Sequence, residues 1–368
     1  MKVTADRGSL VDLLNLVSGV IVSRTPKPAL TCVHMSAADG VLTLVGTDLE
    51  AAVRVSSNKV EITSEGQALI PADKFSQIIR ESVDPTLDIE VDNDAAEIRG
   101  ADSRFKVYGY PVDDFPSVSE FAGDADFEIA AADLHRLIAQ TIFATARENS
   151  RYAINGVLLE RDGNKLTVVA TDGRRLAMSK GNCKPANSDA PKVAAIVPTK
   201  ALNLILRLFD NADQTVRVKI ADNQILFATD DALLTSNLVE GNFPPYKDVI
   251  PKDCDKKATL HTDTLASGVR RAGLLTNEES KGVRFGFSSD GLVLASRAPE
   301  MGEAEVNVEI PKYDGDAIDI GFNPAYILDA LKVVDNSEVS IELKAGNKPG
   351  ILRTGPEFLY VIMPVNLQ

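Results

Sequence analysis

The stretch TVVATDGRRLAMS, residues 167–179, brings together side chains that could carry out chemistry. Asp172 could act as a general acid or base, and Arg174 and Arg175 could clamp a phosphate beside it. The same letters also describe a hairpin turn between two apolar strands, in which an Asp side chain accepts a hydrogen bond from the backbone two residues on. These residues alone leave both interpretations open, so the surrounding elements must decide between them.

Other signs of chemistry are missing from the sequence. It has no Gly-rich phosphate loop, no dinucleotide fingerprint, no H-E-x-x-H zinc motif and no G-x-S-x-G nucleophile elbow. Its cysteines, Cys32, Cys183 and Cys254, are odd in number and far apart, and its 3 histidines are scattered. Neither a disulfide framework nor a metal site is expected from this spacing. We therefore expect a binding protein with no catalytic residue, no metal and no cofactor.

Bulk composition narrows the class of protein. The 368 residues are 44% hydrophobic and 25% charged, which is ordinary for a globular protein of two or three domains. No apolar run approaches the roughly 18 residues of a membrane helix, and the N-terminal residues carry charges where a signal peptide is apolar. We therefore expect a cytoplasmic protein. The net charge of −14 argues against general adhesion to nucleic acid or anionic membrane.

A threefold repeat organises the chain. Each copy has an amphipathic helix, two strands joined by a turn, a second helix entered through proline, and two closing strands. Leu42 and Leu166 are 124 residues apart, and Leu166 and Leu292 are 126 apart. The predicted helices span residues 9–22, 71–81, 131–147, 198–209, 262–275 and 323–334. The predicted domains are residues 1–122, 123–251 and 252–368.

The repeat bears on the turn at Asp172. Asp48 occupies the same place in the first repeat, 124 residues earlier, and the third repeat has Ser296 and Arg297 in place of the Thr-Asp pair. A catalytic aspartate has no reason to recur at the matching turn of another domain, so the repeat favours a structural role for Asp172. Arg174 and Arg175 have no counterpart in the other copies and need a separate explanation.

Charge is unevenly distributed along the chain. The predicted helices carry 9 basic and 6 acidic residues, a net charge of +3 within a chain of net charge −14. A molecule whose helices face a polyanion and whose sheets face water would show this pattern. The basic residues are Lys74, Arg80, Arg136, Arg147, Lys200, Arg207, Arg270, Arg271 and Lys332.

Six motifs, taken together and in order, resemble those of the bacterial sliding clamps, the beta subunits of DNA polymerase III holoenzyme. The resemblance covers the whole chain, although any one motif alone would be weak. The motifs are LTLVGTDLE (42–50), RYAINGVLLE (151–160), ATDGRRLA (170–177), LVEGNFPPYKDVIP (238–251), GFNPAYILDAL (321–331) and YVIMPVNL (360–367).

The resemblance implies an α+β fold of three clamp domains per chain. Two chains would join head to tail into a ring, with helices lining the hole and sheets outside. Such a homodimer encircles duplex DNA without reading its sequence and tethers the replicative polymerase, which confers processivity without catalysis. The clamp loader, other polymerases and repair proteins would bind through short linear peptides, and no membrane is involved. Basic helices inside an acidic exterior would also explain the charge distribution.

The resemblance also implies site residues. The hydrophobic pocket for partner peptides would be formed by Ile154, Thr171, Gly173, Arg174, Arg175, Leu176, Pro244, Val249, Tyr326, Val361, Ile362, Met363, Pro364, Val365 and Leu367, with an arginine or two at its rim. The ring interface would use Phe105, Val107, Leu274 and Leu275. Contacts to DNA phosphates are predicted for Arg24, Lys74, Arg80, Arg136, Arg147, Tyr152, Lys200, Arg207, Arg270 and Lys332.

This chain departs from the family pattern at the rim of that pocket. Arg174 stands where many members have histidine, and Asp248 stands where a basic residue is common. Two other functions remain to be compared with the clamp. One is a hydrolase that uses Asp172 with the two arginines, which a phosphatase assay would reveal. The other is a protein scaffold that never touches DNA, which retention on circular DNA would exclude.

Overall fold

The structure is a computed structural model that describes residues 1–146, 154–187, 190–276, 282–299 and 301–367. These residues form two compact units, each built on two antiparallel sheets. The first unit comprises Met1–His135, Cys183–Pro191 and Lys200–Leu238, and the second comprises Arg136–Asn182, Lys192–Thr199 and Val239–Gln368. Each unit is described separately below.

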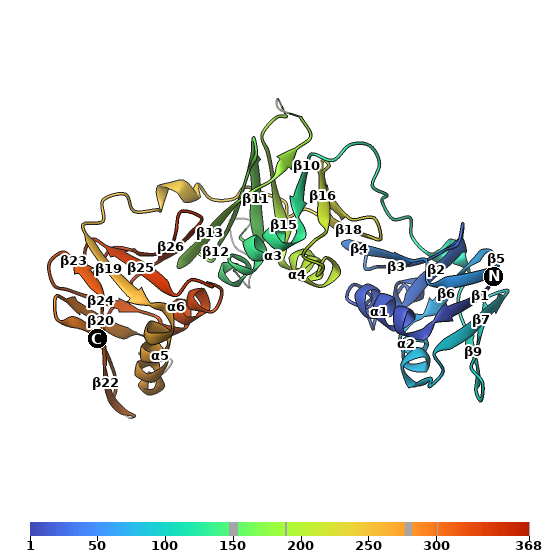
Figure 1. Cartoon of the computed structure of the whole chain (residues 1–368), viewed down its shortest axis with the longest axis horizontal. Helices are drawn as coiled ribbons and strands as arrows, with labels where there is room; N and C mark the ends of the chain where they lie inside the picture. The colour runs from blue at the N-terminus through green and yellow to red at the C-terminus, as the bar shows by residue number, and fades with distance from the viewer. Residues whose placement is uncertain (147–153, 188–189, 277–281, 300, 368) are drawn as a thin grey trace. The chain divides into compact units, whose positions relative to one another are not determined.

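The first unit contains a five-stranded and a nine-stranded sheet (Figure 1). The five-stranded sheet has the order β5 (Val60–Ser64), β1 (Lys2–Asp6), β7 (Thr86–Asp92), β8 (Ala95–Arg99), β9 (Arg104–Tyr108). The nine-stranded sheet has the order β14 (Lys184–Pro185), β10 (Phe127–Ala130), β16 (Thr215–Ile220), β17 (Gln224–Ala228), β18 (Ala232–Asn237), β4 (Ala51–Ser57), β3 (Val41–Thr47), β2 (Cys32–Ala38), β6 (Gly66–Pro71). Its helices are α1 (Arg7–Val17), α2 (Ala72–Glu81) and α4 (Thr199–Leu208), with short 3-10 turns η1 (Pro28–Thr31) and η2 (Val112–Asp114).

The second unit contains a nine-stranded and a four-stranded sheet. The nine-stranded sheet has the order β15 (Val193–Pro198), β11 (Gly156–Asp162), β12 (Lys165–Thr171), β13 (Arg175–Asn182), β27 (Phe358–Ile362), β26 (Gly350–Thr354), β25 (Glu338–Leu343), β19 (Lys256–His261), β23 (Lys312–Asp314). The four-stranded sheet has the order β22 (Gly302–Val308), β21 (Gly291–Ala298), β20 (Val283–Ser288), β24 (Ile318–Phe322). Its helical segments are α5 (Thr262–Ala272), α6 (Pro324–Leu331), η3 (Ile142–Ala144), η4 (Tyr246–Asp248) and η5 (Gly273–Leu275), and α3 (Ala131–Ala139) crosses the division between the units.

Both nine-stranded sheets join strands from different repeats. In the first unit β18 pairs with β4, so that Leu234 lies opposite Val53. In the second unit β13 pairs with β27, so that Leu176 lies opposite Val361. Strands of the central repeat therefore complete the sheets of both flanking repeats, and backbone hydrogen bonds join consecutive repeats.

The helices bury the apolar faces that the sequence predicts. In α1, Leu10, Leu13, Leu14 and Val17 are buried, and the Asp6 carboxylate caps the helix by accepting a hydrogen bond from the Ser9 N–H at 2.7 Å. α1 contacts α2 and also packs on β3 and β4, and in the second unit α5 contacts α6 (Figure 1). These helices therefore cover their sheets on one face.

The third predicted helix is shorter than expected. The sequence pattern predicts a helix over 131–147, but α3 ends at Ala139 and a 3-10 turn follows at Ile142–Ala144. The hydroxyl of Thr141 donates hydrogen bonds to the carbonyl of Leu137 at 2.8 Å and to that of Ile138 at 3.2 Å. A threonine that bonds back in this way competes with helix propagation, which accounts for the early end.

Candidate functional site

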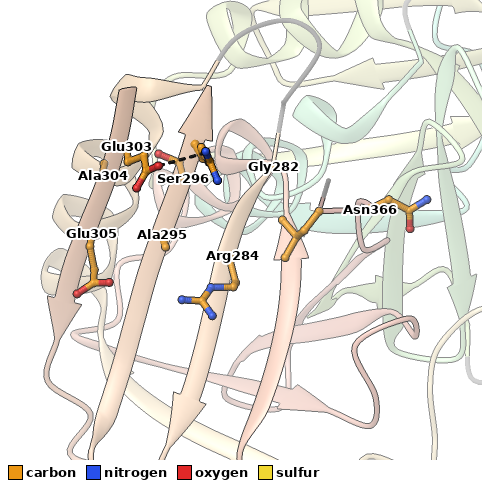
Figure 2. A pocket seen from close by; sticks show the side chains of 10 residues that line it. Gly282, Arg284, Ala295, Ser296, Glu303, Ala304, Glu305 and Asn366 are labelled. Atoms are coloured by element: carbon orange, nitrogen blue, oxygen red, sulfur yellow. Dashed lines mark ion pairs between the residues drawn. The ribbon is translucent and has the colours of Figure 1, made fainter. Parts of the chain in front are cut away.

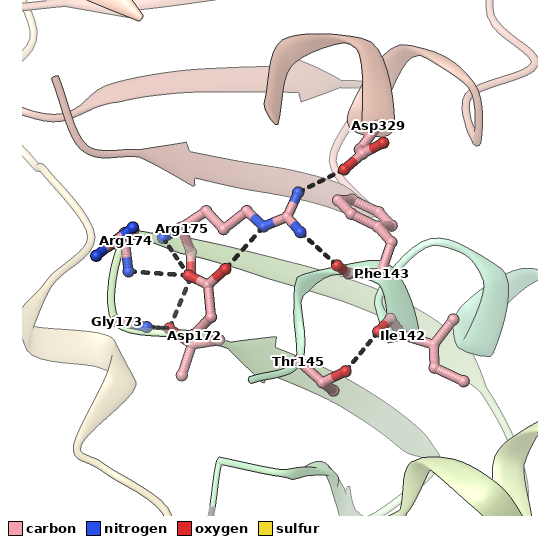
Figure 3. A network of polar contacts seen from close by, with 9 residues as sticks. Ile142, Phe143, Thr145, Asp172, Gly173, Arg174, Arg175 and Asp329 are labelled. Carbon is pink, nitrogen blue, oxygen red and sulfur yellow. Dashed lines mark hydrogen bonds and ion pairs between the residues drawn. The ribbon is translucent and has the colours of Figure 1, made fainter. Parts of the chain in front are cut away.

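The Thr-Asp-Gly turn after β12 is held by its own side chains (Figure 3). One oxygen of Asp172, Oδ1, accepts hydrogen bonds from the backbone N–H of Arg174 at 2.9 Å and of Arg175 at 3.0 Å. The Thr171 hydroxyl accepts from the Gly173 N–H at 3.1 Å and donates to the Arg175 carbonyl at 2.7 Å. Gly173 has a positive φ of 83°, which glycine adopts without strain. Asp172 is therefore a structural turn residue, as the repeat predicts.

The matching turn of the first repeat makes the same four hydrogen bonds. Asp48 Oδ1 accepts from the N–H of Glu50 at 2.9 Å and of Ala51 at 2.8 Å. The Thr47 hydroxyl accepts from the Leu49 N–H at 3.0 Å and donates to the Ala51 carbonyl at 2.7 Å. Because the bonding pattern recurs in full, it belongs to the repeated fold and not to an active site at one of the two turns.

The side chain of Arg175 is mostly buried, with 11% of it exposed, and its guanidinium is surrounded by groups of the protein itself. Its guanidinium donates to Asp172 at 3.0 Å, to Asp329 at 2.8 Å and to the carbonyl of Phe143 at 2.7 Å (Figure 3). It also lies over the rings of Tyr326, at 4.4 Å, and Phe143, at 5.5 Å. Burial by itself would lower the pKa of Arg175, but the hydrogen bond to Asp329 helps to hold that pKa above its usual value. Arg175 therefore links the turn to α6 from within the protein.

Arg174 differs from its neighbour, because it is exposed and only its backbone is fixed. Its carbonyl accepts a hydrogen bond at 2.9 Å from the N–H of Met363, which directly follows β27. The turn is therefore bonded to the residue directly after the C-terminal strand. Met363 is 44% exposed beside this bond. The Arg174 side chain remains the basic group at the surface of the turn.

One face of the nine-stranded sheet carries an apolar cluster next to this turn. Leu176 and Met178 of β13 lie opposite Val361 and Leu359 of β27, and all four side chains are buried. The remaining members come from neighbouring strands and from the chain segment after β18. They are Leu158, Val169, Ile196, Tyr246 and Ile351, with Val239, Phe243, Ile250 and Cys254 packed against them. The cluster is continuous across strands of two repeats.

The segment after the second repeat lies on this cluster and is anchored through Tyr246. The phenol of Tyr246 is buried and donates a hydrogen bond to Glu160 at 2.9 Å, and the ammonium of Lys192 pairs with the same carboxylate at 2.9 Å. This anchor fixes η4, and Val249 directly after η4 is 55% exposed. Pro244, two residues before Tyr246, is half-buried. The segment thus presents an exposed valine above a buried apolar floor.

Five of the predicted pocket residues are buried in the protein: Ile154, Thr171, Leu176, Val361 and Ile362. Ile362 neighbours Val361 in β27, so its side chain points to the opposite face of the sheet, and it lies opposite Arg175 in the register. Ile154 is also buried, and its carbonyl accepts a hydrogen bond from the N–H of Ala146 at 3.0 Å. Ile362 therefore supports the sheet from behind and does not line the apolar face.

The C-terminal tail leaves this region after Pro364. The N–H of Val365 donates to the Gly321 carbonyl at 2.9 Å, and the Leu367 side chain packs on Gly321 and Gly282. Leu367 lines a separate hollow of about 480 Å³ over β20, β21 and β22 (Figure 2). Leu367 is the only one of the predicted peptide-pocket residues that lines this hollow. Leu367 therefore lies against Gly321, Gly282 and this hollow, and its place in the peptide pocket stays a prediction.

The residues predicted to contact DNA phosphates differ in whether their charged groups already have a partner in the protein. Arg24, Arg207 and Arg270 are exposed and form no ion pair with any described residue. The other described members have partners: Lys74 pairs with Asp73 at 3.6 Å, Arg136 with Glu357 at 3.2 Å, Lys200 with Asp48, and Lys332 with Asp329 at 3.6 Å, while Arg80 donates to Asn15. Arg147 and Tyr152 lie outside the described residues.

The predicted ring-interface residues lie at or near two free strand edges. β9, with Phe105 and Val107, is an outer strand of the five-stranded sheet, and Phe105 is 40% exposed. β22 is an outer strand of the four-stranded sheet, and Leu275 in η5 approaches its first residue, Gly302. Leu274 is 70% exposed beside it. A strand edge offers unpaired backbone groups to another strand.

The described residues contain neither a metal-binding group of side chains nor a membrane-spanning helix. No group of three His, Cys, Asp or Glu side chains within the described ranges could hold a metal ion. The three cysteines are free thiols. Among the helices that the structure describes, none is both long and apolar enough to cross a membrane.

Family models for the DNA polymerase III beta subunit match nearly the whole chain. The N-terminal domain matches residues 1–119, the central domain 128–245 and the C-terminal domain 247–366. The beta sliding clamps of Escherichia coli (strain K12) and Pseudomonas aeruginosa are each 34% identical to this chain over 370 residues, covering 100% of both chains.

Solved structures agree with the family models. A sliding clamp from Pseudomonas aeruginosa bound to griselimycin superposes with a TM-score of 0.94 at 34% identity, and one from Bacillus subtilis with a TM-score of 0.94 at 26% identity. Each comparison covers 100% of both chains. The chain therefore belongs to the family of DNA polymerase III beta subunits, the sliding clamps, which serve DNA polymerase as processivity factors and are not enzymes.

Proposed function

We propose that this chain binds short linear peptides of its partner proteins in a groove, called here the partner groove, bounded by the turn 171–176, the segment 244–249 and residues 361–364. The observation that carries this proposal is the buried pair Leu176 and Val361, flanked by the exposed side chains of Val249 and Met363. An apolar floor with exposed apolar side chains at its margin suits large apolar anchors of a peptide. Arg174, exposed at the turn, would contact polar groups of the peptide.

A comparison within the chain supports the location of the partner groove. The first repeat has the same turn beside the same kind of strand pairing, but Ala52 lies there opposite Thr235, where Leu176 lies opposite Val361 in the second. Replacing a Leu–Val pair with an Ala–Thr pair removes the large apolar side chains from the floor. The repeated turn alone therefore does not make a binding site, and we assign the groove to the second turn.

Partners would therefore be recognised by apolar side chains combined with a polar group. We propose peptides with a glutamine and one or two large apolar residues, carried by the replicative polymerase, the clamp loader, other polymerases and repair proteins. A structure of a relative bound to griselimycin shows that a sliding clamp can hold a bound compound. Apolar anchors usually dominate such binding, and polar contacts fix the register.

We further propose that two copies close head to tail around duplex DNA, with three domains per chain at 1–122, 123–251 and 252–368. β9 carries Arg104 and Lys106, and β22 carries Glu303 and Glu305, so the two free edges have opposite charge. Pairing of these edges would bring Phe105 towards Leu274. Opposite charges on opposed strands favour one orientation over others.

DNA inside such a ring would be held by phosphate contacts that carry no sequence information. The free guanidinium groups of Arg24, Arg207 and Arg270 are the strongest candidates. Lys74, Arg80, Arg136, Lys200 and Lys332 would add contacts after exchanging their present partners for phosphate, and Arg147 and Tyr152 remain predictions. Binding would be weak, independent of base sequence and steeply dependent on salt. We place this activity in the cytoplasm.

Peptide titration tests the partner groove. Val249→Asp puts a charge at its exposed margin and should weaken binding of a labelled peptide carrying a glutamine and two leucines by at least about tenfold, because an apolar contact is worth about 1.5–3 kcal/mol. Val83→Asp, at a valine that is 79% exposed in the first repeat, is the matched control and should bind normally. Equal affinity of both variants would remove Val249 from the groove.

A further inference from the structure

Three side chains at a spacing of three residues line one side of α6 and its C-terminal end. Tyr326 and Asp329 belong to α6, and Lys332 directly follows the helix with helical backbone angles, so the three lie in one row. Tyr326 supports the guanidinium of Arg175 at 4.4 Å, and Asp329 accepts a hydrogen bond from that guanidinium at 2.8 Å (Figure 3). Lys332 ends the row with a side chain that is 72% exposed.

The carboxylate of Asp329 has two oxygens with different partners. Oδ2 accepts from Arg175, whose backbone belongs to the turn of the partner groove. Oδ1 lies 3.6 Å from the ammonium of Lys332, a residue proposed to contact DNA phosphate. The Asp329 carboxylate thus contacts both Arg175, next to the proposed peptide site, and Lys332, the proposed phosphate contact.

The two cations compete for the charge of that carboxylate. A phosphate that binds the Lys332 ammonium draws that cation away from Asp329, which leaves Arg175 as the one cation paired with this carboxylate among the described residues. The carboxylate charge is then no longer shared between two cations, which strengthens the charge-assisted bond between Asp329 and Arg175. A stronger bond holds Arg175, and with it the turn 171–176, more firmly against α6.

We infer that Asp329 is a positioning residue that couples the partner groove to DNA, so that phosphate bound at Lys332 increases the affinity of the groove for peptide. The inference rests on the proposed function, because it requires both sites. Exposed ion pairs contribute modestly to stability, so the expected gain in peptide affinity is about twofold to fivefold. Coupling is reciprocal, and bound peptide should tighten DNA binding by the same factor.

The test measures peptide affinity by fluorescence anisotropy on the full-length protein, with and without a saturating short linear duplex that can thread a ring. Wild type should gain about twofold to fivefold on adding duplex. Lys332→Gln should show the raised affinity without duplex and no further gain with it. Lys74→Gln is the matched control, because Lys74 makes a similar exposed pair with Asp73 at 3.6 Å in the first repeat. It should weaken DNA binding and keep the gain in peptide affinity.

Asp329→Asn and Arg175→Lys test the positioning role itself. Asp329→Asn should lower peptide affinity and abolish the response to duplex, whereas Arg175→Lys keeps a cation and should retain part of that response. The inference is overturned if wild type binds peptide and duplex independently, or if Lys332→Gln still responds fully. Failure of peptide or duplex to bind at all would instead contradict the proposed function, so the two failures are distinguishable.

Discussion

At the scale of single residues, neighbouring side chains of the same type have different roles. Arg174 and Arg175 are adjacent, yet Arg174 is exposed while Arg175 has three hydrogen-bond acceptors and two aromatic rings around it. Arg174 lies in the turn before β13 and faces solvent, whereas Arg175 is the first residue of β13 and its side chain reaches Asp329 of α6. Arg174 is therefore the residue to change when partner preference is studied, and Arg175 is the one to leave intact.

At the same scale, the carboxylate of Glu160 allows the pH dependence of fold stability to be tested. Burial by itself would raise its pKa, but hydrogen bonds from Lys192 and Tyr246 outweigh burial and hold the pKa below its usual value. The charged form therefore stabilises the fold above an unfolded pKa of about 4.3, and that contribution is lost as the pH falls through the folded pKa. Glu160→Gln should remove this acid-dependent loss and lower stability at neutral pH by about 1–3 kcal/mol.

Urea unfolding between roughly pH 6 and pH 3 measures this effect. Glu61→Gln is the matched control, because Glu61 is exposed and forms no ion pair with any described residue. The control should keep the wild-type dependence on pH. If Glu160→Gln unfolds with that same dependence, Glu160 does not anchor the segment that carries Val249.

At the scale of elements, much of the fold could be predicted from the sequence. The apolar spacing of Leu10, Leu13 and Leu14 predicts α1 because local periodicity decides which face of a helix is buried. The recurring turn at Asp48 and Asp172 was predicted because its hydrogen bonds are local. Features that depend on distant partners were not predictable in this way.

In the candidate site, the contacts that could not be predicted are those between residues distant along the chain. The family resemblance implies an arginine or two at the rim of the pocket, but nothing in the sequence around Arg175 shows that its guanidinium donates to Asp329 and to the carbonyl of Phe143, which are distant along the chain. The contact of Leu367 with Gly321 was not predictable for the same reason, because it is a tertiary contact. The anchor of Tyr246 on Glu160 was not predicted either. A tyrosine in the proline-rich segment FPPYKD was the only local signal for it.

The strand edges allow a test of element pairing. If β9 of one chain pairs with β22 of the other, Lys106→Glu or Glu305→Lys alone should place like charges together and weaken the dimer. The double variant should restore most of the affinity, since opposite charges are again opposed. Sedimentation at several protein concentrations measures the effect. Full dimer affinity in both single variants would show that these edges do not meet.

At the scale of the whole molecule, the proposed assembly predicts a definite mass. Three domains per chain close a six-domain ring with two copies, so the protein should sediment as a homodimer. Leu274 is 70% exposed, and Leu274→Asp should release monomers because it places a charge in an apolar contact. Val83→Asp, at a valine that is 79% exposed in the first repeat, should leave the dimer intact. A wild-type monomer at micromolar concentration would contradict the ring.

Retention on circular DNA tests the central claim most directly. The protein is loaded onto a nicked circular duplex with a clamp loader and ATP, and washed at high salt, which removes phosphate-mediated binding. A ring that encircles DNA should stay on the intact circle and leave when a restriction enzyme linearises it. Loss from the intact circle at high salt, or retention after linearisation, would show that the protein binds DNA by contact and not by encirclement.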